Sequence, residues 1–473
     1  MLDRRSFLLA SAAATIATGS HAAPQTFDAL LAAISDETTP AAGRLAKLNS
    51  FDPTPLSADD RLDYSAIREG LDLEAQLARF PFGTVGTTIA PYAVTPRNGA
   101  YLARTPSPDA VAAETKRLSN DPPPPDFIRD ATVARLTALP PASAIDRQIA
   151  ALKALVCPHD AGVWRLPDGD AYYALALKAS ASLDIAPDAA HRVGLSQVEA
   201  LSERADVLLK AQGLADGSVG ARLHALGQDT RYLYSDDDAG RAKAVAGMNA
   251  ALDRVRPLLG HDFADPPRGA IRVKLAGPGR IGYREAPAYD GTRPGVYYVD
   301  LREIRRRPSW SLPTVVHHET LPGHLLQLPL QEHADPRPLR LRYTPNAFFE
   351  GWAIYAEQLA DEMGLNDDLA RLGFLQSALV RAARLVIDTG IHFKRWSRED
   401  AIARFRDIAG DAPDTLENEV DRMVVQPGFG AGAALGWHVI QGLRVLPPHD
   451  PVAFHTALLK RGALRLDLLH QVF

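Results

Sequence analysis

A Pro-Gly pair separates two histidines in a segment that otherwise has the pattern of a helix: Pro322 and Gly323 lie between His318 and His324. At about 100° per residue, six steps leave the second ring roughly 240° around the axis from the first, so an unbroken helix would point the two rings apart. Proline removes a helical hydrogen bond, and glycine accepts unusual backbone angles. The pair therefore predicts a kink or loop that returns His324 to the side of His318.

A glutamate follows the first of these histidines, and His-Glu followed by a second histidine is typical of zinc hydrolases. In the usual motif the two histidines are four residues apart, so that one helical face offers both nitrogens to the metal and the glutamate reaches the bound water. With the predicted kink, His318 and His324 become candidate metal ligands. Glu319 becomes the candidate general base.

A third ligand is expected, because catalytic zinc usually takes three protein ligands and keeps one position for water. The apolar and aromatic stretch 346–359 contains two acids, Glu350 and Glu357, seven residues apart and hence on one helical face. A carboxylate in such a stretch is costly unless it is paired or coordinated. We predict that Glu350 binds the metal and that Glu357 orients a ligand histidine from behind.

Each of these residues, taken alone, also has a purely structural explanation. A buried histidine is usually only hydrogen-bonded, and an acid in an apolar helix is usually paired with arginine. The combination of two histidines, a Pro-Gly break and a downstream acid favours a metal site. The expected ion is Zn²⁺, although nitrogen and oxygen ligands also accept Mn²⁺ or Co²⁺.

A later segment places Arg384, Asp388 and His392 at four-residue steps, which aligns them along one helical face. His392 is a candidate catalytic residue that donates to a developing oxyanion, and Asp388 would fix an imidazole or the arginine. The alternative is a buried salt bridge between Arg384 and Asp388 beside a structural histidine. The spacing alone leaves both interpretations open.

Most of the remaining chain has helical patterns separated by turn residues, as at Ser57, where a cap-like start opens an amphipathic run to Ala78. The runs 270–275 and 295–301 are β-branched or aromatic and predict two strands of a small sheet. Between them, 277–282 formally matches a dinucleotide fingerprint. We reject that match, because no helix is expected to open at its glycines. The predicted fold class is mainly α with a small β-sheet.

Composition and charge exclude several classes of protein. The 473 residues are 46% hydrophobic and 23% charged, which is typical of a globular protein, and a net charge of -5 argues against a nucleic-acid partner. Cys157 is the single cysteine, so no internal disulfide is expected.

The first 22 residues have the pattern of a twin-arginine signal peptide. Arg4 and Arg5 precede an apolar, alanine-rich run that ends at Ala22 and is too short for a lasting membrane span. We therefore expect export by the twin-arginine translocase to the periplasm or beyond.

The segments 318–324, 349–357 and 384–392 resemble a bacterial family catalogued as domain of unknown function 885, whose members look like helical zinc peptidases of the thimet-oligopeptidase and carboxypeptidase Taq type. The likeness spans about residues 165 to 440. It implies one domain over residues 26–473, with two helical lobes (26–264 and 265–473) around a deep cleft. The sheet would lie beside the metal-binding helix and hold an extended substrate by strand addition. Tyr297, Tyr298 and Tyr355 are the matching candidates for substrate binding.

This chain departs from the family pattern at two places. Members usually carry a further histidine where this chain has Leu325. Near the end they usually carry an Arg-Tyr pair and a tyrosine after Pro-Gly-Gln, where this chain has Arg422-Met423 and Pro427-Gly428-Phe429. If those tyrosines stabilise an oxyanion, their loss removes a donor worth about 3 to 4 kcal/mol.

The sequence thus predicts an exported zinc metallopeptidase that acts on peptides or small amides, with Glu319 as the base that deprotonates the attacking water. One alternative is a weakened or inactive member that serves as a peptide- or ligand-binding protein. Another is a zinc hydrolase of non-peptide amides or esters.

Overall fold

The computed structural model describes residues 26–82, 89–446 and 450–473. The predicted signal peptide, residues 1–22, lies outside this part of the chain. None of the described helices has the length and apolar character that crossing a membrane requires.

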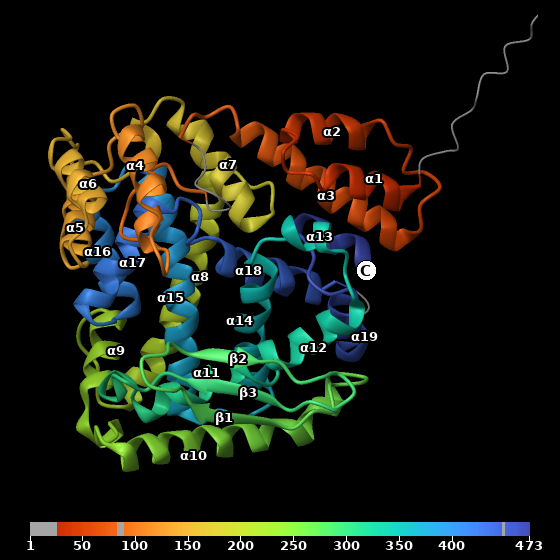
Figure 1. The fold of residues 1–473 in the computed structure, drawn as a ribbon. Helices are drawn as coiled ribbons and strands as arrows, with labels where there is room; N and C mark the ends of the chain where they lie inside the picture. The colour runs from red at the N-terminus through yellow and green to blue at the C-terminus, as the bar shows by residue number, and fades with distance from the viewer. Residues whose placement is uncertain (1–25, 83–88, 447–449) are drawn as a thin grey trace, which may run out of the picture.

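The described residues form mainly α-helices and one small sheet, as the sequence predicts (Figure 1). In chain order the α-helices are α1 (Phe27–Ile34), α2 (Ala41–Asn49), α3 (Ala58–Leu77), α4 (Pro108–Arg117), α5 (Asp126–Thr137), α6 (Ser143–Lys153), α7 (Gly169–Ala181), α8 (Pro187–Ala211), α9 (Val219–Gln228), α10 (Asp238–Val255), α11 (Leu312–Glu319), α12 (His324–Ala334), α13 (Pro338–Arg342), α14 (Ala347–Glu362), α15 (Asp368–His392), α16 (Arg398–Ala409), α17 (Pro413–Val425), α18 (Gly432–Arg444) and α19 (Pro451–Leu459).

Helix α15 lies in the middle of the fold and packs against several other helices. Asp367 caps its start by accepting a hydrogen bond from the Ala370 N–H at 2.8 Å, and its alanine- and leucine-rich sequence contains no proline. It packs along α8 and also contacts α11, α14, α16, α17 and α18 (Figure 1). Because it is covered on several sides, most of its residues are buried, and polar groups along it must find partners inside the protein.

The sheet has the strand order β1-β3-β2, with β1 (Ile271–Leu275) parallel and β2 (Tyr283–Glu285) antiparallel to the central β3 (Gly295–Val299). The two predicted strands are present, and β2 was not predicted. Helix α10 lies along β1, where the Asn249 side chain bonds both the N–H and the C=O of Val273, at 3.0 and 2.9 Å. That amide occupies one edge of the sheet and leaves β2 as the opposite edge strand.

The chain between β1 and β2 corresponds to the rejected dinucleotide fingerprint. It leads into a strand rather than a helix, which agrees with that rejection.

The largest hydrophobic core crosses the boundary expected at residues 264/265. It contains Leu201, Met248 and Phe263 from the first part together with Val273, Trp352 and other residues of the second part. The N-terminal helices add smaller cores, one formed by α1, α2 and α3. The division into two lobes around a cleft stays a prediction.

Two glycines let α14 and α18 touch backbone to backbone. A Cβ at Gly436 would lie 2.1 Å from the carbonyl oxygen of Ala347, and a Cβ at Gly351 would lie 2.5 Å from the carbonyl carbon of Gly436. Both contacts are with backbone atoms, which cannot rotate away. This close approach fixes the position of α14, the helix that carries Glu350 and Glu357.

Replacing Gly436 by Ala should therefore destabilise the protein by about 1–3 kcal/mol, because the added methyl group forces the two helices apart. Gly442→Ala on the same helix is the matched control, since its Cβ would meet open space and alanine favours a helix. Urea unfolding followed by circular dichroism measures both. Equal stability of the two variants would contradict the packing argument.

Candidate metal centre

The helix that begins after Ser311 ends at Glu319, and a new helix begins at His324, so the chain breaks where the Pro-Gly pair lies. A Cβ at Gly323 would lie 1.9 Å from the carbonyl oxygen of His318, so only glycine fits there. Trp352 of α14 donates from Nε1 to the carbonyl oxygen of Pro322 at 3.2 Å. The turn is thus held against both α11 and α14.

This turn brings His318, His324 and Glu350 together. One potential ligand atom from each residue lies within 4.8 Å of the others. His318 Nε2 is 3.6 Å from Glu350 Oε2, and His324 Nε2 is 3.8 Å from Glu350 Oε1. Two ligand atoms bound tetrahedrally at about 2 Å from a zinc ion are roughly 3.4 Å apart, so small side-chain shifts suffice to close the group on an ion.

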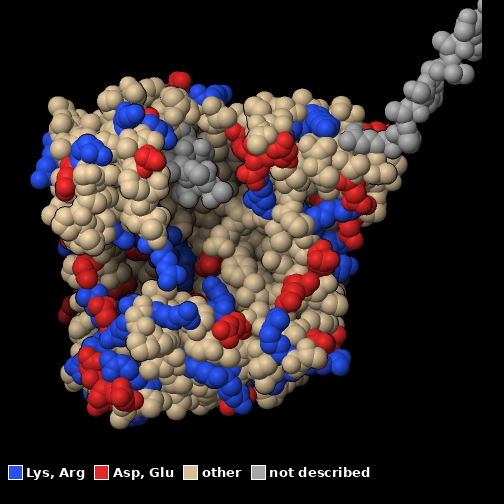
Figure 2. Space-filling view, viewed as in Figure 1, with Lys and Arg blue, Asp and Glu red and all other residues tan. Residues whose placement is uncertain are grey.

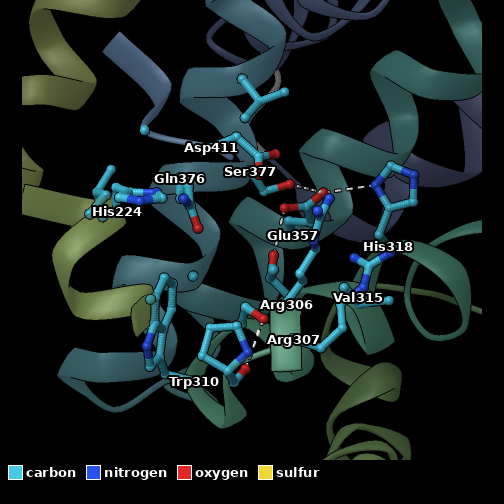
Figure 3. Close-up of a pocket in the computed structure, with 18 of the residues that line it drawn as sticks. His224, Arg306, Arg307, Trp310, Val315, His318, Glu357, Gln376, Ser377 and Asp411 are labelled. Atoms are coloured by element: carbon cyan, nitrogen blue, oxygen red, sulfur yellow. Dashed lines mark hydrogen bonds and ion pairs between the residues drawn. The ribbon is translucent and has the colours of Figure 1, made fainter. Parts of the chain in front are cut away.

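A buried carboxylate orients His318 from the side opposite Glu350. Glu357 Oε1 is 2.7 Å from His318 Nδ1, and the same carboxylate accepts hydrogen bonds from Thr314 at 2.5 Å and Ser377 at 3.0 Å. Figure 3 shows Ser377 and His318 reaching Glu357 from two sides. With Nδ1–H donated to Glu357, His318 directs its Nε2 at Glu350, which is the orientation of a metal-ligating histidine.

The second histidine is oriented by its own helix. His324 Nδ1 lies 3.4 Å from Gln327 Oε1, and its ring stacks on Phe349 at 4.0 Å. Its Nε2 is buried and has no hydrogen-bond partner among the described residues. A buried nitrogen without a partner is costly. The donor set and this orphaned nitrogen fit a divalent ion, which His318, His324 and Glu350 would hold.

The two histidines and the carboxylate of this group have shifted pKa values. Burial lowers the pKa of His318, but the carboxylates of Glu350 and Glu357 outweigh it and raise the value to about 9. Burial lowers the pKa of His324 well below its usual range, and the neighbouring His318 and Arg284 lower it further. Burial raises the pKa of Glu350, but the interaction with His318 lowers it more, so the net shift is downward. Without an ion, the site thus holds a neutral His324, an ionised Glu350 and a protonated His318, and a bound ion would displace the proton from His318 Nε2.

Glu319 lies beside this group in a cavity of about 390 Å³ that His318, Glu319, Glu357 and Tyr297 help to line. Arg284 of β2 holds its carboxylate, with Nη1 2.8 Å from Glu319 Oε2. The surface above the sheet is hollowed, and Lys and Arg side chains gather around the hollow (Figure 2).

Of the three predicted substrate-binding tyrosines, the structure brings only Tyr297 to the cavity. Tyr298 is the next residue on β3 and points to the other face, where it stacks on Tyr283 at 4.4 Å. Tyr355 is fully buried and its hydroxyl bonds His455 Nε2 at 2.8 Å. These placements correct the prediction for Tyr298 and Tyr355, because side chains alternate across a strand and because Tyr355 is part of the core.

The structure does not bring His392 to the metal group, which corrects its predicted catalytic role. His392 lies 15 residues after Ser377 on α15, hence about 22 Å further along the helix. Its ring is fully buried, Nδ1 accepts from the Val163 N–H at 3.2 Å, and Nε2 donates to the Met423 carbonyl at 2.9 Å. Both ring nitrogens form hydrogen bonds with backbone groups, so His392 is a structural residue.

Asp388 and Arg384 do not form the alternative salt bridge either. Asp388 accepts hydrogen bonds from the Tyr173 hydroxyl at 2.7 Å and from the backbone N–H groups of Gly428 and Gly430 at 3.0 Å each. Arg384 lines the cavity and pairs with Glu419 of α17 at 2.7 Å. Asp388 is thus a structural anchor for the 428–430 loop, and it fixes neither an imidazole nor the arginine.

Several residues of the site were missed at the sequence level. Thr314 and Gln327 lie four residues before His318 and three after His324, and this helical spacing was an available signal. Ser377 and Arg284 come from distant segments, and no spacing in the sequence connects them with Glu357 or Glu319.

The fold and site define a mainly helical protein with a His-His-Glu group at the junction of three helices. A family model described as "Bacterial protein of unknown function (DUF885)" matches residues 128–472, and the chain belongs to that family.

Solved structures similar to this chain include two putative lipoproteins. The putative lipoprotein from Colwellia psychrerythraea has 26% identity and a TM-score of 0.76, over 93% of this chain and 90% of that one. A putative lipoprotein of unknown function from Shewanella oneidensis has 15% identity and a TM-score of 0.67, over 96% and 93% of the two chains, and shows the shared fold. No curated protein matches.

The structural role of His392 has a pH signature. Burial lowers its pKa to about 4, so folding keeps the ring neutral, and the stability it contributes is present above the unfolded value near 6.5 and lost as pH falls toward 4. His392→Gln can replace both backbone hydrogen bonds without titrating. Urea unfolding should show a smaller loss of stability between pH 7 and pH 5 for this variant than for the wild type.

The exposed His470→Gln is the control and should keep the wild-type difference between the two pH values. If His392→Gln lost as much stability as the wild type over this range, the assignment of His392 as a buried neutral histidine would be wrong.

Proposed function

We propose that this protein is an exported zinc-dependent hydrolase that cleaves peptides. The observation that carries the proposal is the convergence of His318, His324 and Glu350, with His324 Nε2 buried and without a hydrogen-bond partner among the described residues. Structural zinc sites are usually closed by four protein ligands, whereas three ligands beside a cavity are typical of catalytic zinc. Mn²⁺ or Co²⁺ would suit the same donors.

A bound ion at this group would lower the pKa of a coordinated water and polarise a carbonyl oxygen. Glu319 is the carboxylate next to the ligands that lines the cavity, and it would accept the water proton at one oxygen while Arg284 holds the other at 2.8 Å. Tyr297, on the cavity wall, would present its phenol to the substrate.

The shape of the site supports a peptide substrate. β2 is an edge strand, and its Arg284 contacts Glu319, so an extended chain that pairs with this edge would run past the candidate base. A cavity of about 390 Å³ accommodates only a few residues. This supports cleavage of short peptides or of chain ends.

Export is supported by two independent features. The first 22 residues have the pattern of a twin-arginine signal, and the structural neighbour with 26% identity is described as a putative lipoprotein, a class that is exported. We propose a periplasmic or otherwise extracytoplasmic location.

One observation favours the alternative of a weakened enzyme that binds peptides. Phe429 stands where the family usually carries the glutamine of Pro-Gly-Gln, and no tyrosine follows it at residues 430–440. Its ring lies under the guanidinium of Arg422, with 3.5 Å from Cζ to the ring centroid. Together with the structural role of His392, this removes two of the oxyanion donors that the sequence suggested. The ion and Tyr297 would then have to stabilise the oxyanion.

Glu319→Gln should keep the metal and lower turnover about 10²- to 10⁴-fold, because glutamine cannot accept the water proton. Glu332→Gln on the neighbouring α12 is the control, since its exposed carboxylate pairs only with Arg293 at 3.1 Å among the described residues. New termini in a peptide mixture, identified by mass spectrometry, give the rates. Unchanged turnover in zinc-loaded Glu319→Gln would contradict the assignment of Glu319 as the general base.

Glu357→Gln should weaken metal affinity about 10- to 100-fold, because the residue behind a ligand histidine sets its orientation and basicity. Glu362→Gln on the same helix is the matched control, as it lies at the surface and pairs with Arg444 at 2.7 Å. Competition for zinc against a chromogenic chelator measures both. Wild-type affinity in Glu357→Gln would show that Glu357 does not support a metal-ligating histidine.

A further inference from the structure

Four arginines lie on or against α15 and α17 near one side of the cavity, and among the described residues only one of them forms an ion pair with an acid. We call Arg97, Arg381, Arg384 and Arg422 the basic cluster. Arg384 pairs with Glu419 at 2.7 Å, whereas the other three have no Asp or Glu oxygen within 4.0 Å among the described residues. The cluster thus has more positive than negative charge.

The positive charges of the members lower the pKa values of their neighbours. Arg97 Nη2 donates to the carbonyl of Asn418, next to Glu419, at 3.2 Å. Burial lowers the pKa of Arg422, Glu419 opposes this, and the charges of Arg97 and Arg384 lower it further. Arg381 acts in the same direction on Arg384. Like charges held near one another cost free energy unless an anion binds between them.

Two members of the basic cluster line the cavity that His318 and Glu319 also line. Arg381 and Arg384 line this cavity together with His318 and Glu319, and the Nε atom of each arginine is buried without a hydrogen-bond partner among the described residues. Arg381 Nη1 bonds Ser377 Oγ at 2.9 Å, and Ser377 in turn donates to Glu357. Two hydrogen bonds therefore separate this arginine from the carboxylate that orients His318.

The positions of the arginines along α15 indicate how far a bound carboxylate would lie from the level of Glu357. Arg381 and Arg384 lie four and seven residues after Ser377, hence about 6 and 10 Å along the helix from the level of Glu357. An extended peptide rises about 3.3 Å per residue, so 10 Å corresponds to about three residues. Guanidinium groups bind carboxylates through paired, charge-assisted hydrogen bonds.

We propose that the basic cluster binds a carboxylate of the substrate within about three residues of the bond that is cleaved. That carboxylate belongs either to the free C-terminus of a peptide or to an Asp or Glu side chain. The inference rests on the proposed function, since it assigns the substrate class of the same site. It makes the protein selective for acidic peptide ends.

Peptide binding to metal-free protein tests the cluster without relying on turnover. The probes are four N-acetylated alanine-based pentapeptides: one with a free C-terminus, one with a C-terminal amide, and two amides with Glu or Gln at the penultimate position. Isothermal titration should show at least one acidic probe binding about tenfold or more tighter than its neutral counterpart. Tighter binding of the free-acid peptide would indicate recognition of the C-terminus, and tighter binding of the Glu peptide would indicate recognition of an acidic side chain.

Arg384→Gln and Arg422→Gln should each remove most of that difference. The exposed Arg406→Gln of α16 is the matched control and should keep it. Arg384→Gln leaves Glu419 unpaired, so circular dichroism must show that it folds. Arg422→Gln leaves no acid without its partner, and it carries the test if Arg384→Gln unfolds.

Equal binding of acidic and neutral probes, no binding of any acidic probe, or an undiminished difference in folded Arg422→Gln would each overturn the proposal. Failure of the proposed function looks different. In that case zinc-loaded protein cleaves no peptide, while metal-free protein still binds the acidic probes through the basic cluster. Cleavage of neutral peptides without acidic preference would instead keep the function and reject the carboxylate site.

Discussion

The backbone of Gly323 lies against the carbonyl of His318, and the candidate site depends on this contact. Any side chain at residue 323 would collide with an oxygen 1.9 Å away, so only glycine lets α12 begin directly beside the end of α11. Trp352 donates to the same turn from α14. One short turn thus sets the positions of all three helices that supply His318, His324 and Glu350.

Buried charge explains why so many polar partners surround this turn. Glu357 is almost completely buried, and an unpaired carboxylate there would cost several kcal/mol. His318, Thr314 and Ser377 satisfy it, and Ser377 extends the network to Arg381. The same network orients the imidazole and connects the metal group with the basic cluster. Positioning of the ligands and recognition of a substrate carboxylate would therefore share one set of hydrogen bonds.

Local patterns in the sequence predicted the parts of the molecule that local physics determines. The Pro-Gly pair predicted the break at residues 322–323, and the seven-residue spacing placed Glu350 and Glu357 on one face of α14. Runs of β-branched or aromatic residues predicted β1 and β3. Strand β2 has only three residues, which is too short for a periodic signal.

Spacing failed where a long helix or a tertiary contact decided the outcome. Arg384 and His392 share a face of α15, but Arg384 lines the cavity while His392 lies further along the helix, bonded to the backbone of Val163 and Met423. The partner of Asp388 is Tyr173, more than two hundred residues earlier, and no pattern within one segment reveals such a pair.

The central claim is that His318, His324 and Glu350 hold one catalytic divalent ion. Inductively coupled plasma mass spectrometry of the purified protein, after zinc loading and gel filtration, tests it most directly. The account predicts one zinc per chain in the wild type and in the His333→Ala control, and almost none in folded His324→Ala. A wild type that retains no zinc, or a His324→Ala protein that retains one equivalent, would contradict it.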